Sequence, residues 1–240
     1  MTIDLNCDMG EAYGIYKCGD DAGIMPLISV ANVACGFHAS DPSVMRQTVR
    51  LAKQHGVRVG AHPSYPDRDG FGRRRMEMEA EELTACIIYQ VGALKGFLDA
   101  EGMALNHVKP HGALYGAAWR DEKVARAIAR AAKAFAVPLM AMSGTGMGNW
   151  YQDEGVDVIW ETYVDLDYND DGEIVITRQH KPVSAEAAAA QALRSARDGQ
   201  VQTVSGKLLD VKCETICVHS DTPGAVEIAR AVKDAVASIA

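Results

Sequence analysis

Short apolar stretches alternate along the chain with longer segments in which apolar residues recur at helical spacing. The short stretches predict strands, and the longer segments predict the amphipathic helices that cover them. About seven core strands are expected, at 3–5, 28–34, 57–61, 104–108, 138–142, 156–160 and 215–218. Strands that alternate with helices form parallel sheets joined by right-handed crossovers. We therefore predict an α/β fold, an irregular seven-stranded (β/α) barrel.

Capping residues mark the ends of the predicted helices. Asp41 suits the N-cap of the first helix, Pro42 suits its first helical position, and Gly56 ends it. The same reasoning places further helices at 79–101, 121–135 and 184–198 and after residue 223.

A turn signal interrupts the regular alternation in the second half of the chain. Asp171-Gly172 precedes an apolar run at 174–176, which predicts a small hairpin inserted near 163–180. No low-complexity linker divides the chain, so residues 1–240 are expected to form a single barrel domain.

Composition and charge narrow the classes of partner. The 240 residues carry 24 Lys and Arg against 32 Asp and Glu, a net charge of −8. Proteins that bind nucleic acid are usually basic, so this acidic chain is not expected to do so. No apolar run approaches the ~18 residues that span a bilayer, and no basic or hydrophobic leader precedes the first strand. We expect a cytoplasmic protein with neither a nucleic-acid nor a membrane partner.

The six cysteines form no C-x-x-C pair, and several lie in apolar, strand-like stretches. A free thiol packs there as a small hydrophobe, and disulfides are rare in the cytosol. We therefore expect buried thiols, ahead of disulfides or a cysteine-based zinc site.

Nearly every predicted strand ends in a titratable or amide side chain. In a (β/α) barrel the C-terminal ends of the strands share one rim, so these side chains would converge there. They are Asn6, Asp8, Glu11, His38, His62, Lys109, His111, Glu161, Asp165, His219 and Asp221. Ordinary wet loops would supply Ser, Asn, Gly and Lys instead, so the pattern favours a shared site.

The stretch HVKPH at 107–111 carries three of the candidate side chains on one face if it is extended. His107, deep in a barrel, fits a satisfied core residue better than a reacting group. Lys109 on an inward face needs a negative partner, either a phosphate or a carboxylate.

The loop from Gly60 to Arg75 is too long for a tight strand-to-helix turn, and such loops are usually functional. Its prolines stiffen it. The arginines Arg73, Arg74 and Arg75 would either bind an anion or form a solvated face.

The candidate residues also suit a tightly bound divalent metal ion. Asp8, His38 and His62 are plausible ligand types, although no H-E-x-x-H motif supports them. The chain has no G-x-x-x-x-G-K-[ST] phosphate loop, and the glycine-rich residues 144–148 are a weak substitute. No serine or cysteine lies in a nucleophile elbow. Carboxylates, histidines and a lysine are left as the reacting groups.

At these residues the sequence resembles the LamB/YcsF family, whose bacterial members are the A subunit of ATP-dependent 5-oxoprolinase. The matching stretches are DLNCDMGE (4–11), NVACGFHASDP (32–42), GAHP (60–63), YPD (65–67), GFGRR (70–74), YQ (89–90), VKPHGALY (108–115), CVH (217–219) and DTP (221–223). The resemblance covers essentially the whole chain in order.

The resemblance implies a barrel akin to the glycoside hydrolase/deacetylase fold. It also implies ATP-driven hydrolysis of the 5-oxoproline lactam to L-glutamate, with ATP and Mg²⁺ as cofactors and subunits B and C as partners. The residues then expected to bind substrate are Asn6, Glu11, Tyr65, Phe71, Arg73, Tyr115, Asp165, His219 and Asp221.

The catalytic candidates under this resemblance are Asp8, His38, His62, Lys109, His111 and Glu161. Our hypothesis is that Lys109 and Mg²⁺ offset charge on the transferred phosphoryl group. Asp8 or Glu161 would activate water, and His38, His62 or His111 would protonate the ring nitrogen. Alanine at Asp8 or Lys109 should then abolish turnover and leave the fold intact.

The sequence departs from the family pattern at a few positions. Ser64 and Ser220 stand where the family usually has glycine, and Leu166 replaces the arginine of its E-x-F-A-D-R-x-Y stretch. Losing a cation near the rim changes which anion is bound, so a related lactam or cyclic amide stays open as substrate. A stand-alone metal-dependent amidohydrolase or deacetylase, a non-catalytic binding subunit, and self-association also stay open.

Overall fold

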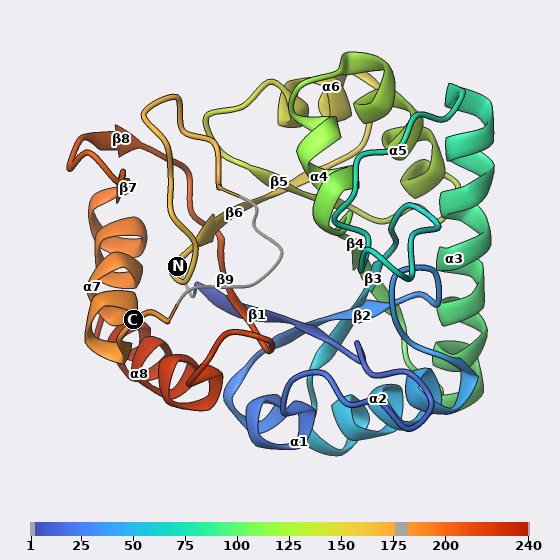
Figure 1. The fold of residues 1–240 in the computed structure, drawn as a ribbon, viewed down its shortest axis with the longest axis horizontal. Helices are drawn as coiled ribbons and strands as arrows, with labels where there is room; N and C mark the ends of the chain where they lie inside the picture. Colours follow the sequence, from blue (N-terminus) through green and yellow to red (C-terminus); the bar gives the residue numbers. More distant parts are fainter. Residues whose placement is uncertain (1–2, 176–181, 240) are drawn as a thin grey trace.

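The computed structural model describes residues 3–175 and 182–239, and in them seven parallel strands close into a barrel (Figure 1). The barrel strands are β1 (Asp4–Met9), β2 (Val30–Ala34), β3 (Arg58–His62), β4 (Leu105–Val108), β5 (Leu139–Met142), β6 (Val158–Tyr163) and β9 (Thr215–His219). The last strand, β9, pairs with both β6 and β1 and so closes the sheet. The predicted seven-stranded (β/α) barrel is confirmed.

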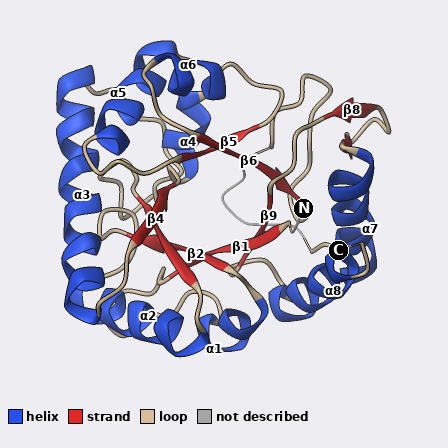
Figure 2. Cartoon of the chain, turned by 180° about the vertical axis from the view of Figure 1, so that it is seen from behind, coloured by secondary structure: helices blue, strands red, loops and turns tan. Residues whose placement is uncertain are grey.

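Helices surround the barrel on its outside (Figure 2). They are α1 (Asp21–Ile24), α2 (Pro42–His55), α3 (Ala80–Glu101), α4 (Gly112–Ala118), α5 (Glu122–Lys133), α6 (Met147–Asp153), α7 (Ala185–Leu193) and α8 (Ala225–Ala237), with a 3-10 turn at Met25–Leu27. The start of α2 lies where the sequence places it, because Asp41 accepts the backbone N–H groups of Ser43 and Val44 at 2.7 and 3.0 Å. Gly56 ends this helix in a left-handed conformation, with φ of 67°.

Strands β1, β3, β6 and β9 reach beyond the C-terminal ends of the apolar runs that predict them, whereas β2, β4 and β5 begin one or two residues later than predicted. In β1, Leu5, Cys7 and Met9 belong to the hydrophobic core, whereas Asn6 and Asp8 alternate with them and bond to other polar side chains of the barrel. The expected strand at 3–5 is therefore too short. Periodicity misses the extension because polar side chains paired within a barrel leave a strand looking like a loop.

The C-terminal third differs from the prediction in its local detail. Helix α7 ends at Leu193 and continues as a π-helical turn, Arg194–Asp198, which ends at Gly199. An antiparallel hairpin of β7 (Gln200–Gln202) and β8 (Leu208–Asp210) follows, which the sequence did not predict because its strands are too short to show periodicity. In the segment near 163–180, the described part holds a turn with one antiparallel bridge between Tyr168 and Ile174. Residues 176–181 of that segment lie outside the described residues.

Helix α3 is, among the described helices, the one whose length and composition alone would let it cross a membrane. One face is buried through Leu83, Ile87 and Leu94. On the same face Gln90 binds the backbone of Ser64, accepting its N–H at 2.9 Å and donating to its carbonyl at 2.8 Å. In this fold α3 is thus a helix that packs on the barrel.

All six cysteines are free thiols, as expected. Cys7, Cys35 and Cys217 are buried, and the other three are partly buried.

A glycine in β3 gives the first testable expectation. A Cβ atom on Gly60 would overlap the ring of His107, which is fully buried inside the barrel. We expect Gly60→Ala to lower the free energy of unfolding by at least about 1–3 kcal/mol, because a packed interior cannot absorb the added methyl group. Chemical denaturation measures this.

The matched control is Gly92→Ala in α3, where the added Cβ meets nothing within 4 Å. A helix-interior glycine replaced at an open site should raise stability by about 0.5–1 kcal/mol. Equal unfolding midpoints for the two variants would contradict the tight packing of His107 on β3.

Candidate active site

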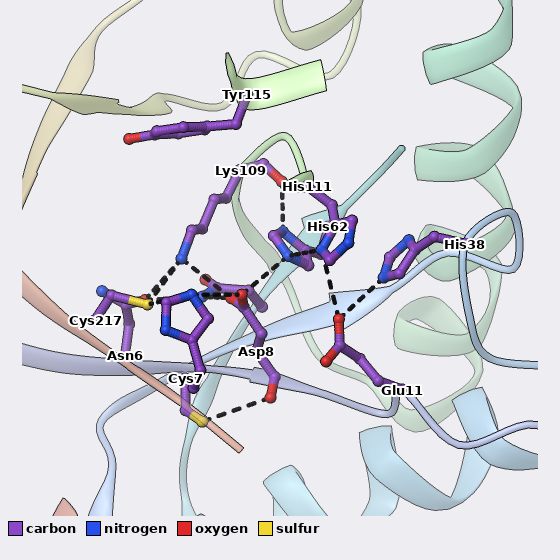
Figure 3. Close-up of polar contacts among 12 residues, drawn as sticks. Asn6, Cys7, Asp8, Glu11, His38, His62, Lys109, His111, Tyr115 and Cys217 are labelled. Atoms are coloured by element: carbon purple, nitrogen blue, oxygen red, sulfur yellow. Dashed lines mark hydrogen bonds and ion pairs between the residues drawn. The ribbon is translucent and has the colours of Figure 1, made fainter. Parts of the chain in front are cut away.

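A pocket opens at the C-terminal ends of the strands, where the sequence analysis expects the site. Its walls come from several strand ends and from the loops that follow them. The lining residues are Asp8, His62, Arg73, Lys109, Pro110, His111, Gly112, Tyr115, Tyr163, Leu166, Ile174 and His219. Figure 3 shows polar side chains of this site, among them Asp8, His62 and Lys109, pointing toward one another.

Lys109, directly after β4, is the buried cation of the site and is 2% exposed. Its Nζ lies 3.1 Å from Asp8 Oδ1, 3.0 Å from Glu161 Oε1 and 3.0 Å from the Cys217 sulfur. Burial opposes the charge, but Asp8, Cys217 and Glu161 outweigh it and hold the pKa of Lys109 well above its usual value. Lys109 therefore remains an ammonium group, and the negative partners expected for it are these carboxylates.

Glu161 on β6 is fully buried and has both oxygens engaged. Oε1 faces Lys109, and Oε2 accepts hydrogen bonds from Tyr163 at 2.6 Å and Tyr115 at 3.2 Å. Burial, with Glu161 nearby, raises the pKa of both tyrosines well above the usual value, so both remain donors. This carboxylate is committed to holding Lys109 and the two hydroxyl groups.

A hydrogen-bonded chain inside the barrel orients Asp8. Asn32 donates from Nδ2 to Asp8 Oδ1 and to Asn6 Oδ1, each at 2.8 Å. His107 Nε2 lies 2.8 Å from Asn32 Oδ1, and since that oxygen only accepts, Nε2 carries the proton. Burial, with a smaller effect of Lys109, lowers the pKa of His107 to about 3, so this ring is neutral. His107 is thus a satisfied core residue that positions Asn32, the interpretation the sequence favours.

Main-chain carbonyls orient the rings of His62 and His111. His62 Nδ1 donates to the carbonyl of Lys109 at 2.7 Å, and His111 Nε2 donates to the carbonyl of Phe71 at 2.8 Å. The remaining ring nitrogens, His62 Nε2 and His111 Nδ1, face each other at 3.0 Å. Asp8 Oδ2 lies 3.2 Å from His62 Nε2. Burial opposes ionisation of Asp8, yet His62 and Lys109 outweigh it and hold its pKa well below the usual value.

Glu11 and His38 form a second pair beside these histidines. His38 Nε2 lies 3.1 Å from Glu11 Oε1, and the His38 ring stacks on His111 with centroids 3.8 Å apart. Burial lowers the pKa of His38 and of His111 well below the usual value. Burial, assisted by Asp8 and Asp221, raises the pKa of Glu11. The pair is held away from water at the side of the pocket.

Asp165 holds His219 on the opposite side of Asp8. Its carboxylate accepts the backbone N–H of His219 at 2.7 Å, the Nδ1 proton at 2.9 Å and the Thr222 hydroxyl at 3.1 Å. The other ring nitrogen, Nε2, lies 3.6 Å from Asp8 Oδ2. Burial opposes protonation, but Asp165 outweighs it and raises the pKa of His219. A histidine oriented by a carboxylate is suited to carry a proton.

The loop between β3 and α3 closes one side of the pocket. Arg73 lines the pocket and donates to Asp221 at 2.9 Å. Arg74 instead pairs with Asp67 within the loop, and Arg75 is exposed. Of the three arginines whose role the sequence left open, Arg73 is therefore the one at the pocket.

The structure brings most of the predicted site residues together, with differences in how they contribute. Tyr65 is buried in the hydrophobic core and does not line the pocket. Phe71 contributes its carbonyl to His111 and packs its ring edge-on against His38. Asn6 lies below the pocket, donating to Thr215 at 2.8 Å.

Among the polar residues of the site that were not singled out in the sequence are Asn32, Tyr163 and Cys217. Asn32 carries a usable signal, because an amide within an apolar strand run needs buried partners. Cys217 could have been found from its strand, since it alternates with His219 on one face.

Three groups of side chains in the described residues have ligand atoms close enough to share a metal ion. They are Asp8, His62 and His111; Asp8, Cys217 and His219; and Glu11, His38 and His111. The set expected from sequence, Asp8 with His38 and His62, is divided between two of these groups.

The glycine-rich residues 144–148 follow β5 and lead into the short helix α6. Within the described part of the chain, none of them lines the pocket. Nothing in this segment adds to its weak phosphate-loop character.

Comparison with known proteins supports one family. The model of the LamB/YcsF family matches residues 3–239. The lactam utilization protein lamB of Emericella nidulans is 46% identical over 236 residues, covering 97% of this chain and 93% of that protein. The A subunit of 5-oxoprolinase from Thermus thermophilus is 46% identical over 241 residues, covering 98% and 96%. The crystal structure of the lactam utilization protein from Thermus thermophilus superposes with a TM-score of 0.92 at 45% identity, covering 100% of this chain and 97% of that one.

Proposed function

The chain belongs to the LamB/YcsF family, and we propose that it is the A subunit of a 5-oxoprolinase, which hydrolyses the 5-oxoproline lactam to L-glutamate coupled to ATP hydrolysis. Relatives at 46% identity over nearly the whole chain carry that name. The observation that supports this activity best is the buried ammonium of Lys109 at the floor of a pocket also lined by Asp8, His62 and His219.

The site offers the groups that opening an amide ring requires. Water adds to the lactam carbonyl carbon, the C–N bond breaks, and the ring nitrogen gains a proton to become the amine of glutamate. Lys109 stabilises negative charge that develops on oxygen in the low-dielectric pocket. The carboxylate of Asp8, with His62 Nε2 beside it, activates the attacking water by accepting its proton. His219, oriented by Asp165, delivers a proton to the ring nitrogen. Glu161 holds Lys109 in place, so we assign water activation to the cluster at Asp8.

ATP would make the stable lactam electrophilic, because transfer of its γ-phosphoryl group to the lactam oxygen leaves ADP and an activated C–O–phosphoryl group. When the first water adds and the ring C–N bond breaks, the product is an acyl phosphate. A second water then hydrolyses it to the carboxylate of glutamate and inorganic phosphate. We propose that ATP with Mg²⁺ is used by the assembled enzyme, with subunits B and C as partners of this chain. The relatives are named as one lettered subunit of 5-oxoprolinase, which supports a multi-subunit enzyme. The free thiols fit a reducing compartment, so the cytoplasm is the proposed location.

A related lactam is the second candidate substrate, and Leu166 is the observation that favours it. Leu166 lines the pocket at the position where the family pattern has arginine. Arg73 remains at the pocket as a cation for a carboxylate, although it is paired with Asp221. A less anionic cyclic amide would suit this lining.

The activity is tested by measuring glutamate formed from 5-oxoproline with ATP and Mg²⁺. We expect glutamate and ADP from the chain mixed with its candidate B and C subunits, and neither from the chain alone. The same B and C preparation with the A subunit from Thermus thermophilus serves as the competence control.

Two outcomes would contradict the proposal. Glutamate formed by the chain alone without ATP would indicate a stand-alone hydrolase. No glutamate with competent partners would indicate another lactam, and Leu166→Arg would then show whether the missing arginine is the cause.

A further inference from the structure

The facing nitrogens of His62 and His111 define an unusual point in the site. The carbonyls of Lys109 and Phe71 each take a ring proton, so His62 Nε2 and His111 Nδ1 are left facing each other across 3.0 Å. Asp8 Oδ2 lies 3.2 Å from His62 Nε2. Three electron-rich atoms in this arrangement repel one another unless a cation lies among them, either the proton through which His62 lowers the pKa of Asp8 or a metal ion in its place.

Each of these three side chains also makes hydrogen bonds through the atoms that point away from the cluster. The far nitrogens of His62 and His111 donate to backbone carbonyls, and Asp8 Oδ1 accepts from Asn32 at 2.8 Å and from Lys109 at 3.1 Å. Metal-binding histidines usually donate their second N–H to a carbonyl or carboxylate, and ligating carboxylates are themselves hydrogen-bonded. Asp8, His62 and His111 thus each offer a ligand atom within 4.8 Å of the other two.

We propose that Asp8 Oδ2, His62 Nε2 and His111 Nδ1 bind one divalent transition-metal ion of the zinc type. Ligand atoms about 2.1 Å from a tetrahedral ion lie about 3.4 Å apart, close to the 3.0 and 3.2 Å separations of this cluster. Two imidazoles and one carboxylate, with an open position, form a ligand set of catalytic zinc sites. Magnesium prefers oxygen ligands, so the ion proposed here is distinct from the Mg²⁺ that accompanies ATP.

The charge around the cluster favours a cation there. The ammonium of Lys109 is shared between Asp8 and Glu161, so one positive charge faces two carboxylates. Glu11 adds a third buried carboxyl 3.5 Å from His111 Nδ1. A bound ion would act as a Lewis acid toward the lactam carbonyl or water, and only this role rests on the function proposed above.

Metal binding is tested without any assay of turnover, so its failure is distinguishable from failure of the 5-oxoprolinase proposal. The protein is stripped with a chelator and titrated with Zn²⁺, Co²⁺ or Mg²⁺ by calorimetry. We expect one Zn²⁺ or Co²⁺ per chain, a rise in Tm with Zn²⁺, and no competition from millimolar Mg²⁺. No uptake of Zn²⁺ or Co²⁺ would overturn the proposal and leave a proton shared between the two rings.

Variants locate the ion. His62→Gln and His111→Gln should weaken Zn²⁺ binding by more than about 100-fold, since even a lost outer partner typically costs 10–100-fold. His55→Gln, on the exposed end of α2, is the matched histidine control and should bind as the parent does. Loss of binding in Cys217→Ser but not in His111→Gln would overturn the assignment in favour of Asp8, Cys217 and His219.

The absorption spectrum of the unmodified chain with bound Co²⁺ identifies the ligands even if a variant fails to fold. Ligation by two imidazoles and a carboxylate gives visible ligand-field bands without thiolate charge transfer. A strong thiolate band in the near ultraviolet would place Cys217 on the ion and contradict the proposed set.

Discussion

Lys109→Met is expected to reduce turnover of the assembled enzyme by at least about 100- to 1,000-fold, the usual loss when a buried group that stabilises developing charge is removed. The same change should lower the free energy of unfolding by about 3–5 kcal/mol, because Asp8 and Glu161 would be left buried without their shared cation. Turnover is measured as glutamate release, and stability by chemical denaturation. From the sequence alone, alanine at Lys109 is expected to leave the fold intact, and burial of this ion pair argues against that expectation.

Two further variants separate the roles of Lys109. The double variant Lys109→Met/Glu161→Gln removes one of the stranded charges, so it should recover part of the stability and none of the activity. Lys95→Met, which breaks an exposed pair with Asp99, should change stability by no more than about 1 kcal/mol. A Lys109→Met protein with parental activity would eliminate Lys109 from the chemistry.

His219→Gln is expected to lower kcat by about 100- to 10,000-fold, the range typical of a lost general acid, while KM changes little. Asp165→Asn should lower kcat by a similar factor, because an amide at this position no longer fixes the His219 ring with its proton on Nδ1. Steady-state kinetics of the reconstituted enzyme give both parameters.

The double variant provides the internal control. If His219 and Asp165 act as one unit, His219→Gln/Asp165→Asn should be hardly worse than either single variant. Multiplicative losses, or losses confined to KM, would show that the two residues bind substrate separately, as the sequence analysis assigned them.

Most of the site could be predicted because side chains at the C-terminal ends of barrel strands share one rim, whatever the details of packing. This expectation depends only on the order of the strands along the chain. Asp8, His62, Lys109 and His219 lie in different strands or directly after them, and closure of the barrel alone brings them to one pocket. The fold could be predicted from the sequence for the same reason. The alternation of apolar runs and capped helices is still recognisable when a strand or helix boundary is predicted wrongly by one residue.

The partners of each residue could not be predicted, because they depend on barrel closure and on main-chain atoms. Lys109 reaches across to Asp8 on β1 and Glu161 on β6, and only the barrel geometry sets those distances. The ring of His62 is oriented by its hydrogen bond to the carbonyl of Lys109, and a residue's type says nothing about where its backbone oxygen points. The sequence therefore named the histidines of the site without assigning their roles.

The closing strand also has a consequence for how the protein is made. Strand β1 is the first barrel strand of this chain to be synthesised, and its partner β9 is the last. Thr215 donates to the carbonyl of Asp4 across 211 residues of chain. Register pairs Asp8 with His219 at this seam. Contacts so distant in sequence form late and slow folding, so the site residues of β1 stay without their β9 neighbours until that strand has been made. We therefore expect truncation before β9 to remove both the closed barrel and the activity.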